Sequence, residues 1–197
     1  MGQIVYVMGK SSSGKDTIYK TLLADRELKL SPIVLYTTRP IREGETDGVE
    51  YHFTDEAGFE RMKAENQVIE SRVYHTCHGD WTYFTSSAGI DLNAGDYIVI
   101  GTPESYEKVA AFYGTHNVLP VYIELDDGIR LQRALDREKK ELSPRYKELC
   151  RRFLSDSEDF SEEVLERLNL PERFENNNLD ACICEIKAYI RRTQNGY

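Results

Sequence analysis

The 197-residue sequence has no long hydrophobic run, few cysteines and no excess of basic residues. No apolar stretch approaches the roughly 18 residues that a membrane-spanning helix needs, so no membrane partner is expected. The four cysteines form no CxxC pair, which argues against a disulfide framework and the common zinc sites. Acidic residues outnumber basic ones by 34 to 25, and the net charge of −9 argues against a general nucleic-acid binder.

The N-terminus also lacks the basic segment and apolar core of a secretory signal, so we expect a cytoplasmic protein with free thiols. Apolar residues make up 40% of the chain and aromatic residues 11%, enough for a packed core without a disulfide or metal. This length favours one domain with an inserted part. The oligomeric state is not indicated by the sequence.

Short apolar runs alternate with longer amphipathic segments along the chain. This alternation is typical of a parallel sheet with helices on both faces, so the predicted fold class is α/β with three layers. Strands are predicted at 4–8, 33–36, 97–100 and 119–125 and near Phe174, and helices at about 15–26, 104–113, 126–140 and 183–190.

Two regions interrupt this alternation. Residues 40–90 contain short strand-like pieces around one predicted helix, which indicates a small mixed insertion. Residues 130–175 are predicted to be mostly long, charged helix. Within the insertion, His75, Cys77 and His78 could suggest a metal site, but their spacing fits no common zinc pattern and a loop is the better reading.

A glycine-rich loop lies directly between the first predicted strand and the first predicted helix. Its sequence, GKSSSGKDT, matches GxxxxGK, in which backbone N–H groups and a helix N-terminus surround an anion. Lys15 can reach the β- and γ-phosphates of ATP. Asp16 stands where the strict motif has Ser or Thr, so the hydroxyl of Thr17 is the candidate ligand for Mg²⁺. The alternative is a serine-rich turn without a ligand. The residues predicted to bind ATP are Gly9, Ser11, Ser12, Ser13, Gly14, Lys15, Asp16 and Thr17.

A second anion site is indicated after the second predicted strand, where Arg39 and Arg42 lie three residues apart and Tyr51 follows. Guanidinium groups bind phosphate oxygens in pairs, so these side chains suit a second phosphate. The alternative is a pair of solvated surface arginines.

The order of these pieces resembles the guanylate kinase family. The chain has the phosphate loop, then TTRPIREGE and GVEYHF, then Val68-Ile69-Glu70 and Tyr83-Phe84-Thr85. The resemblance covers nearly the whole chain and is strongest in the first 55 residues. It implies a P-loop kinase fold with an inserted small mixed monophosphate-binding subdomain and a helical lid. The implied division is a core of 1–39, 91–129 and 168–197, a monophosphate-binding subdomain of 40–90, and a lid and long helix of 130–167.

The resemblance also implies roles for single residues. The implied ligands of the acceptor phosphate are Arg39, Arg42, Tyr51 and Tyr83. Glu70 would accept hydrogen bonds from N1 and N2 of guanine, and Thr85 would help to read the base. The chain departs from the family at Leu35 and Tyr36, where a serine is frequent, at the segment 98–102, which lacks an aspartate, and at Phe84, which replaces a glycine. Two base-reading groups are therefore missing.

Basic residues are concentrated in the predicted lid. Residues 130–152 carry nine basic and four acidic side chains, a local charge of +5, whereas residues 153–175 carry −6. Arginines that close over a migrating phosphoryl group stabilise its charge. The resemblance makes Arg137 and one of Arg151 or Arg152 the lid arginines, and the alternative is a solvated charged helix.

These observations predict a nucleoside monophosphate kinase that uses ATP and Mg²⁺, with GMP as the expected acceptor and GDP as product. The missing base-reading groups leave open a kinase for another phosphorylated acceptor, such as a ribose bisphosphate or another nucleotide. A non-catalytic guanylate-kinase-like binding module is the third possibility, but the presence of Gly9, Gly14 and Lys15 counts against it.

Overall fold

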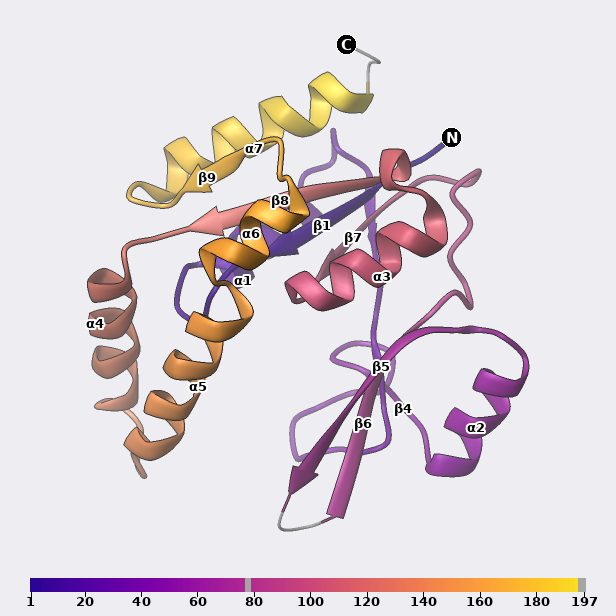
Figure 1. The fold of residues 1–197 in the computed structure, drawn as a ribbon, viewed down its shortest axis with the longest axis horizontal. Helices are drawn as coiled ribbons and strands as arrows, with labels where there is room; N and C mark the ends of the chain where they lie inside the picture. Colours follow the sequence, from indigo (N-terminus) through magenta and orange to yellow (C-terminus); the bar gives the residue numbers. More distant parts are fainter. Residues whose placement is uncertain (77–78, 195–197) are drawn as a thin grey trace.

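A five-stranded parallel sheet forms the centre of the computed structural model, which describes residues 1–76 and 79–194 (Figure 1). Its strand order is β2-β7-β1-β8-β9, and every neighbouring pair runs parallel. The strands are β1 (Ile4–Met8), β2 (Leu30–Pro32), β7 (Asp96–Ile100), β8 (Val118–Glu124) and β9 (Arg173–Glu175).

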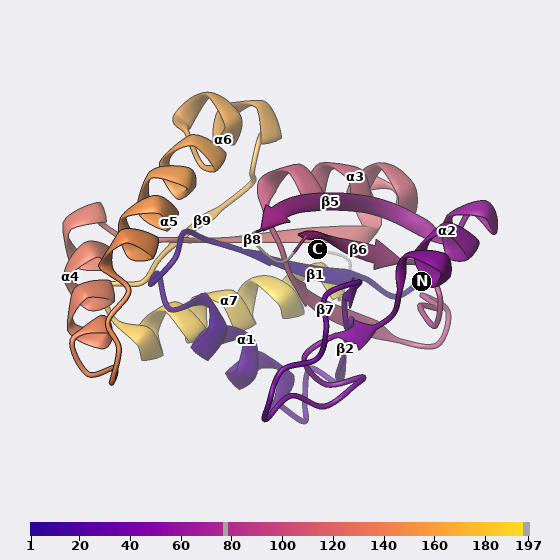
Figure 2. The same ribbon diagram turned by 90° about the horizontal axis from the view of Figure 1, so that it is seen from below.

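Helices cover both faces of this sheet, because alternate residues of a strand point to opposite sides. Val5 and Val7 of β1 pack with α1 and α7, whereas Ile4 and Tyr6 pack with α3 and α6. These helices are α1 (Lys15–Leu23), α3 (Pro103–Tyr113), α6 (Glu162–Leu168) and α7 (Leu179–Gln194). The predicted three-layer α/β class is confirmed, and Figure 2 shows the layers from below.

A second, four-stranded sheet has the order β4-β3-β6-β5. It is mixed, since β3 pairs parallel with β4 but antiparallel with β6, and β5 and β6 form an antiparallel hairpin. Helix α2 (Glu56–Ala64) packs on this sheet, where the rings of Phe59 and Phe84 are 4.9 Å apart. The strands are β3 (Tyr36–Thr37), β4 (His52–Phe53), β5 (Val68–Thr76) and β6 (Gly79–Ser86).

The strand predicted at 33–36 does not form as one element. Strand β2 ends at Pro32 and β3 begins at Tyr36, in the other sheet. Ile33 donates its backbone N–H to the carbonyl of Ile98 at 2.9 Å, and the chain then leaves the large sheet. The apolar run therefore begins at the edge of the large sheet, where Ile33 bonds Ile98, and ends in the small sheet, where Tyr36 belongs to β3. The composition of the run alone does not reveal this division.

Two charged helices extend from the central sheet beside the small sheet (Figure 1). These are α4 (Asp127–Glu138) and α5 (Tyr146–Asp159), and the chain continues from α5 into α6. Within the described ranges, no helix is both long and apolar enough to cross a membrane.

Candidate active site

The glycine-rich loop connects β1 to the N-terminus of α1, and Gly9 and Lys15 at its two ends line a cavity. Gly14 has φ 94°, a left-handed conformation that side chains disfavour, and no side chain caps the helix at this position. Asn176 donates to the carbonyl of Ser13 at 2.7 Å and would lie 2.4 Å from a Cβ at position 14. The hydroxyl of Ser13 is buried without a hydrogen-bond partner. This open N-terminus suits an anion.

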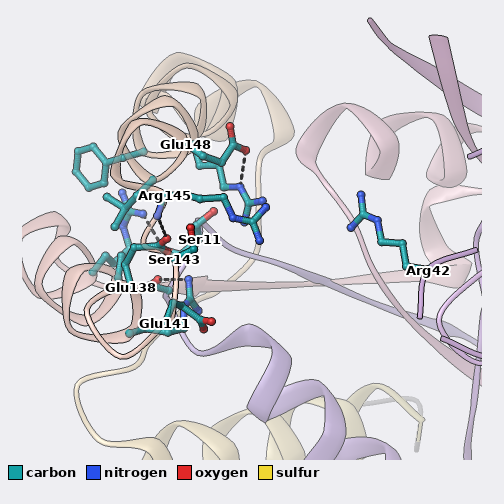
Figure 3. Close-up of a pocket in the computed structure, with 14 residues that line it drawn as sticks. Ser11, Arg42, Glu138, Glu141, Ser143, Arg145 and Glu148 are labelled. Atoms are coloured by element: carbon teal, nitrogen blue, oxygen red, sulfur yellow. Dashed lines mark hydrogen bonds and ion pairs between the residues drawn. The ribbon is translucent and has the colours of Figure 1, made fainter. Parts of the chain in front are cut away.

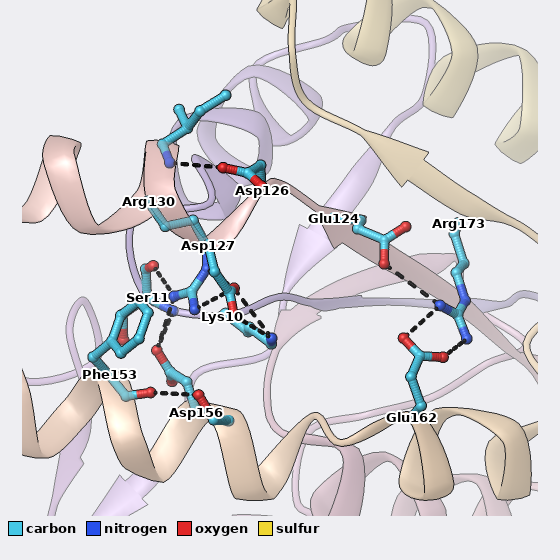
Figure 4. A network of polar contacts seen from close by, with 12 residues as sticks. Lys10, Ser11, Glu124, Asp126, Asp127, Arg130, Phe153, Asp156, Glu162 and Arg173 are labelled. Atoms are coloured by element: carbon cyan, nitrogen blue, oxygen red, sulfur yellow. Dashed lines mark hydrogen bonds and ion pairs between the residues drawn. The ribbon is translucent and has the colours of Figure 1, made fainter.

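A polar network fixes the outer side of the loop to α4 and α5 (Figure 4). Arg130, only 1% exposed, contacts Asp127 at 2.7 Å and Asp156 at 3.4 Å and donates to the Ser11 carbonyl at 2.9 Å. Asp156 accepts the backbone N–H of Ser11 at 2.8 Å, and Lys10 pairs with Asp127 at 3.2 Å. Burial raises the pKa of Asp127, but hydrogen bonds from Arg130 and Lys10 outweigh it and the pKa is lowered.

On the acceptor side, Arg39 is buried and held by several partners. Its guanidinium pairs in bidentate fashion with Glu45 at 2.6 and 2.7 Å, and its Nε donates to the Tyr83 hydroxyl at 3.1 Å. It also lies 5.2 Å from the ring centres of Tyr51 and Phe53. The hydrogen bond from Arg39 lowers the pKa of Glu45 to about 2. Glu45 therefore stays ionised at neutral pH and positions Arg39.

Arg42 lies in a more open setting than Arg39. Its side chain is exposed, with the guanidinium 5.9 Å from the ring centre of Trp81. It lines a hollow of about 270 Å³ together with Ser11, Ser12 and lid residues. In Figure 3, Arg42 lies across an open space from Arg145 and Glu148.

The β5–β6 hairpin presents one continuous face beside the loop. Glu70 is buried, and its Oε1 accepts the Thr85 hydroxyl at 2.6 Å. Its Oε2 lies 3.3 Å from Nε of Arg72, whose Nη1 donates to the Thr102 hydroxyl at 3.3 Å. The paired positions across the hairpin are Glu70 with Thr85, Arg72 with Tyr83 and Tyr74 with Trp81.

The arginines predicted to belong to a lid lie on α4 and α5. Arg137 donates to the Ser12 hydroxyl at 3.4 Å. Arg151 and Arg152 both bind Glu148, at 2.8 and 2.9 Å, and these hydrogen bonds lower the pKa of Glu148 to about 2. Their guanidinium groups are thus held by one carboxylate at the edge of the site.

One cavity of about 520 Å³ joins these three parts, a volume usual for small-molecule sites. Lys15 of the loop, Tyr51, Arg72 and Tyr83 of the small sheet, and Arg151 and Arg152 of the lid line it. Leu35, Ile100 and Gly101 form an apolar part of the wall. The cavity therefore combines cations with aromatic and apolar surfaces, as a phosphorylated ring compound requires.

The first half of the chain is similar in sequence to guanylate kinases. Residues 1–96 match the guanylate kinase family model. The chain is 45% identical to a guanylate kinase of Zymomonas mobilis over 80 residues, which are 40% of this chain and 36% of the relative. It is 49% identical to a guanylate kinase of Thermobifida fusca over 69 residues, 34% of each chain. The aligned segment thus spans about a third of the length of these curated relatives.

The fold match extends further than the sequence match. The crystal structure of guanylate kinase from Anaplasma phagocytophilum matches 98% of this chain and 87% of its own, with TM-score 0.64 and 19% sequence identity. This likeness confirms the P-loop kinase fold over the whole chain. The resemblance of the sequence to guanylate kinases is likewise confirmed for its first half.

Within the guanylate kinase fold, the predicted site residues occupy different settings. Lys15, Tyr51, Tyr83, Arg151 and Arg152 line the large cavity. Ser11, Ser12, Arg42 and Arg137 line the smaller hollow. Among the described residues, those that line the large cavity do not include Glu70 or Thr85, which lie behind Arg72.

Asp16 and Thr17, the latter the predicted metal ligand, line different hollows. Asp16 lines a hollow with Leu35 and Tyr51, on the acceptor side, and lies 3.8 Å from Lys15. Thr17 lines a groove between α1 and α7 together with Asp25 and Lys187. This position does not favour the predicted role of Thr17, because its side chain lies on the far side of the helix from the cavity.

Four charged residues of the site were missed by the sequence reasoning. Two of them had a signal: Glu45 lies three residues after Arg42, and Arg72 lies two residues after Glu70, hence on the same strand face. Arg130 and Asp156 lacked such a signal, because only the packing of α4 against α5 brings them together.

The three cysteines within the described ranges line neither of the two cavities. Cys150, Cys182 and Cys184 are free thiols, and Cys77 lies outside the described residues, as does His78. No cluster of three metal-ligating side chains occurs within 1–76 and 79–194.

Proposed function

We propose that this chain transfers the γ-phosphoryl group of ATP to GMP and so forms ADP and GDP. The observation that carries the proposal is the shared cavity, which is lined by Lys15 of the loop, by Tyr51 and Tyr83 of the small sheet and by Arg151 and Arg152 of α5. A donor phosphate at the loop and an acceptor phosphate at the tyrosines would then meet in one cavity. The match to guanylate kinases over residues 1–96 supports GMP as acceptor.

Catalysis would rest on positioning and charge stabilisation, without a covalent enzyme intermediate. Lys15 and the loop N–H groups would hold the donor phosphates, and Arg42, Tyr51 and Tyr83 the acceptor phosphate. The lid cations would then neutralise the charge on the migrating group and exclude water. This assignment treats 40–90 as the acceptor-binding part and 130–167 as the lid.

For Mg²⁺, we assign Asp16 in place of Thr17. A carboxylate is a hard oxygen ligand of the kind that Mg²⁺ prefers, and Asp16 lies beside Lys15 on the acceptor side. Bound there, the metal would neutralise phosphate charge. The variant Asp16→Asn should therefore raise the Mg²⁺ concentration needed for half-maximal rate, and Thr17→Val should not.

The proposal is tested by ADP release from ATP and Mg²⁺ with GMP, dGMP, AMP, UMP, CMP and ribose 1,5-bisphosphate as acceptors. GMP-dependent turnover is expected, and Lys15→Ala should lower kcat at least roughly a hundred-fold. Lys20→Ala, an exposed lysine on the same helix, is the matched control. Absence of turnover with GMP in protein that binds ATP would refute the proposed activity.

A second candidate is a kinase for a different phosphorylated acceptor. The observation that favours it is the wall of the cavity, where Leu35 and Ile100 offer no hydrogen bond and Arg72 offers a cation. Turnover with ribose 1,5-bisphosphate but not with GMP would establish this alternative.

A further inference from the structure

The cavity is also lined by Arg72, a cation that is not among the residues expected to bind guanine, namely Glu70 and Thr85. Arg72 lines the cavity, and its side chain is 18% exposed, whereas that of Glu70 is 1% exposed. The carboxylate expected to meet the base is therefore buried beside the arginine, and only the arginine of the two lines this cavity. A ligand that enters the cavity would meet the guanidinium first.

Two contacts fix the direction of this guanidinium. Nε lies 3.3 Å from Oε2 of Glu70, and Nη1 donates to the hydroxyl of Thr102 at 3.3 Å. Glu70 is itself held, since its Oε1 accepts the hydroxyl of Thr85 at 2.6 Å. Glu70 belongs to β5 and Thr102 is the N-cap of α3, so Arg72 contacts two elements, while Thr85 of β6 holds Glu70.

Part of the cavity wall is apolar, and the hydroxyl of Thr102, which also lines the cavity, already accepts a hydrogen bond from Arg72. Leu35, Ile100 and Gly101 line the cavity beside Arg72 and carry no side-chain donor or acceptor. Tyr74 and Trp81 provide aromatic surface on which a planar ring can stack. A base placed there would meet aromatic faces and, at its edge, the remaining N–H groups of Arg72.

We propose that Arg72 is a specificity-determining residue of the acceptor site, which donates hydrogen bonds to O6 and N7 of guanine, and that Glu70 is its positioning residue. A guanidinium fork matches these two adjacent acceptors of guanine, whereas adenine presents an amino donor beside N7. Glu70 then acts through Arg72, by keeping the fork oriented, and not on the 2-amino group of the base. The proposal rests on the proposed GMP kinase activity.

The experiment measures equilibrium binding by calorimetry and KM with GMP, IMP, 7-deaza-GMP and AMP. IMP keeps O6 and N7 but lacks the 2-amino group, so it should bind within about three-fold of GMP, because the proposed contacts are retained. 7-Deaza-GMP lacks N7, and AMP lacks O6. Both should bind at least roughly ten-fold more weakly than GMP.

Variants separate recognition from folding. Arg72→Ala should weaken GMP binding roughly ten- to hundred-fold and remove the preference over AMP. Arg61→Ala, an exposed arginine of α2, is the matched control. Because Arg72→Ala leaves Glu70 buried without its counter-ion, the double variant Glu70→Gln/Arg72→Ala is measured as well, with the same expected loss. Glu70→Gln alone should reduce the difference in binding affinity between GMP and 7-deaza-GMP, because the guanidinium of Arg72 is then less well oriented.

Some outcomes overturn the inference while the proposed activity stands. If IMP binds at least ten-fold more weakly than GMP and both Arg72 variants bind GMP normally, Glu70 reads the 2-amino edge and the proposal is wrong. If no nucleotide is phosphorylated and ribose 1,5-bisphosphate is, the proposed GMP kinase activity fails, and the guanine assignment with it.

Discussion

Arg39 and Arg42 lie three residues apart in the sequence but differ in burial and in their contacts. Arg39 is 2% exposed, and its guanidinium bonds Glu45, Tyr83 and the Pro40 carbonyl. Most of its hydrogen-bond donors are therefore occupied by protein. Arg42 is exposed toward the smaller hollow. We infer that Arg39 organises the acceptor side and that Arg42 is the arginine available to a ligand phosphate.

This difference predicts a separation between stability and binding. Arg39→Ala should lower the free energy of unfolding by about 2–4 kcal/mol, because it leaves a glutamate and a tyrosine without their buried partner. Arg42→Ala should leave unfolding nearly unchanged but raise the KM for GMP roughly ten- to hundred-fold, the effect of one charged hydrogen bond. Denaturant unfolding and steady-state kinetics of both variants test this. Equal loss of stability in the two would contradict the assignment.

At the scale of the element, α4 and α5 are tied to the phosphate loop before any ligand binds. Arg130 of α4 and Asp156 of α5 meet at 3.4 Å, and each also bonds the backbone of Ser11. The ring of Phe153 lies 4.8 Å from the Arg130 guanidinium. The loop is therefore braced from outside by the helices that carry the lid arginines, so loop geometry and lid position are coupled.

Replacing Arg130, which contacts both Asp156 and the Ser11 backbone, should lower protein stability and weaken ATP binding. Arg130→Leu is expected to destabilise the protein by about 2–4 kcal/mol, since Asp156 loses its buried counter-ion, and to raise the KM for ATP. Arg133→Leu, at an exposed arginine three residues further along the same helix, is the control and should change stability by no more than about 0.5 kcal/mol. Thermal unfolding and ATP titration measure the two effects. An unchanged KM for ATP would show that the loop does not need the brace.

At the scale of the whole molecule, charge is distributed unevenly. The chain carries a net charge of −9, yet residues 130–152 carry +5 and supply arginines to both cavities. Arg42 lies across the hollow from those arginines (Figure 3). A ligand with phosphates at both ends would bridge the two sides and reduce their repulsion. Binding of both substrates is therefore expected to draw the lid toward the small sheet.

An adenosine–guanosine pentaphosphate, which joins both substrates, tests this closure. At a hundred-fold excess over its Kd it should stabilise the fold by about 2.7 kcal/mol, which raises Tm by roughly 5–10 °C for a chain of this size. Small-angle X-ray scattering should show a smaller radius of gyration than for the free protein. Lys15→Ala should reduce both changes. A raised Tm with an unchanged radius would mean that the lid does not move.

The sequence alone determined the fold class and the phosphate loop. The alternation of short apolar runs and amphipathic segments is a local property of the chain. The left-handed backbone conformation at Gly14 likewise follows from the residue type and does not depend on distant residues. The arginines of the acceptor segment and the lid could be found in the same way. Their individual roles could not, because Arg39 and Arg42 look alike in a sequence.

Only the tertiary structure decided which polar groups meet. Burial of Glu70 behind Arg72, the brace between Arg130 and Asp156 and the division of the run at 33–36 between two sheets all depend on contacts between distant segments. The cost of burying a charge without a partner selects these pairings, and it is set by three-dimensional packing. Thus the sequence determined where the glycine-rich loop and the clustered arginines lie along the chain, and packing determined which of these side chains are buried and which are exposed.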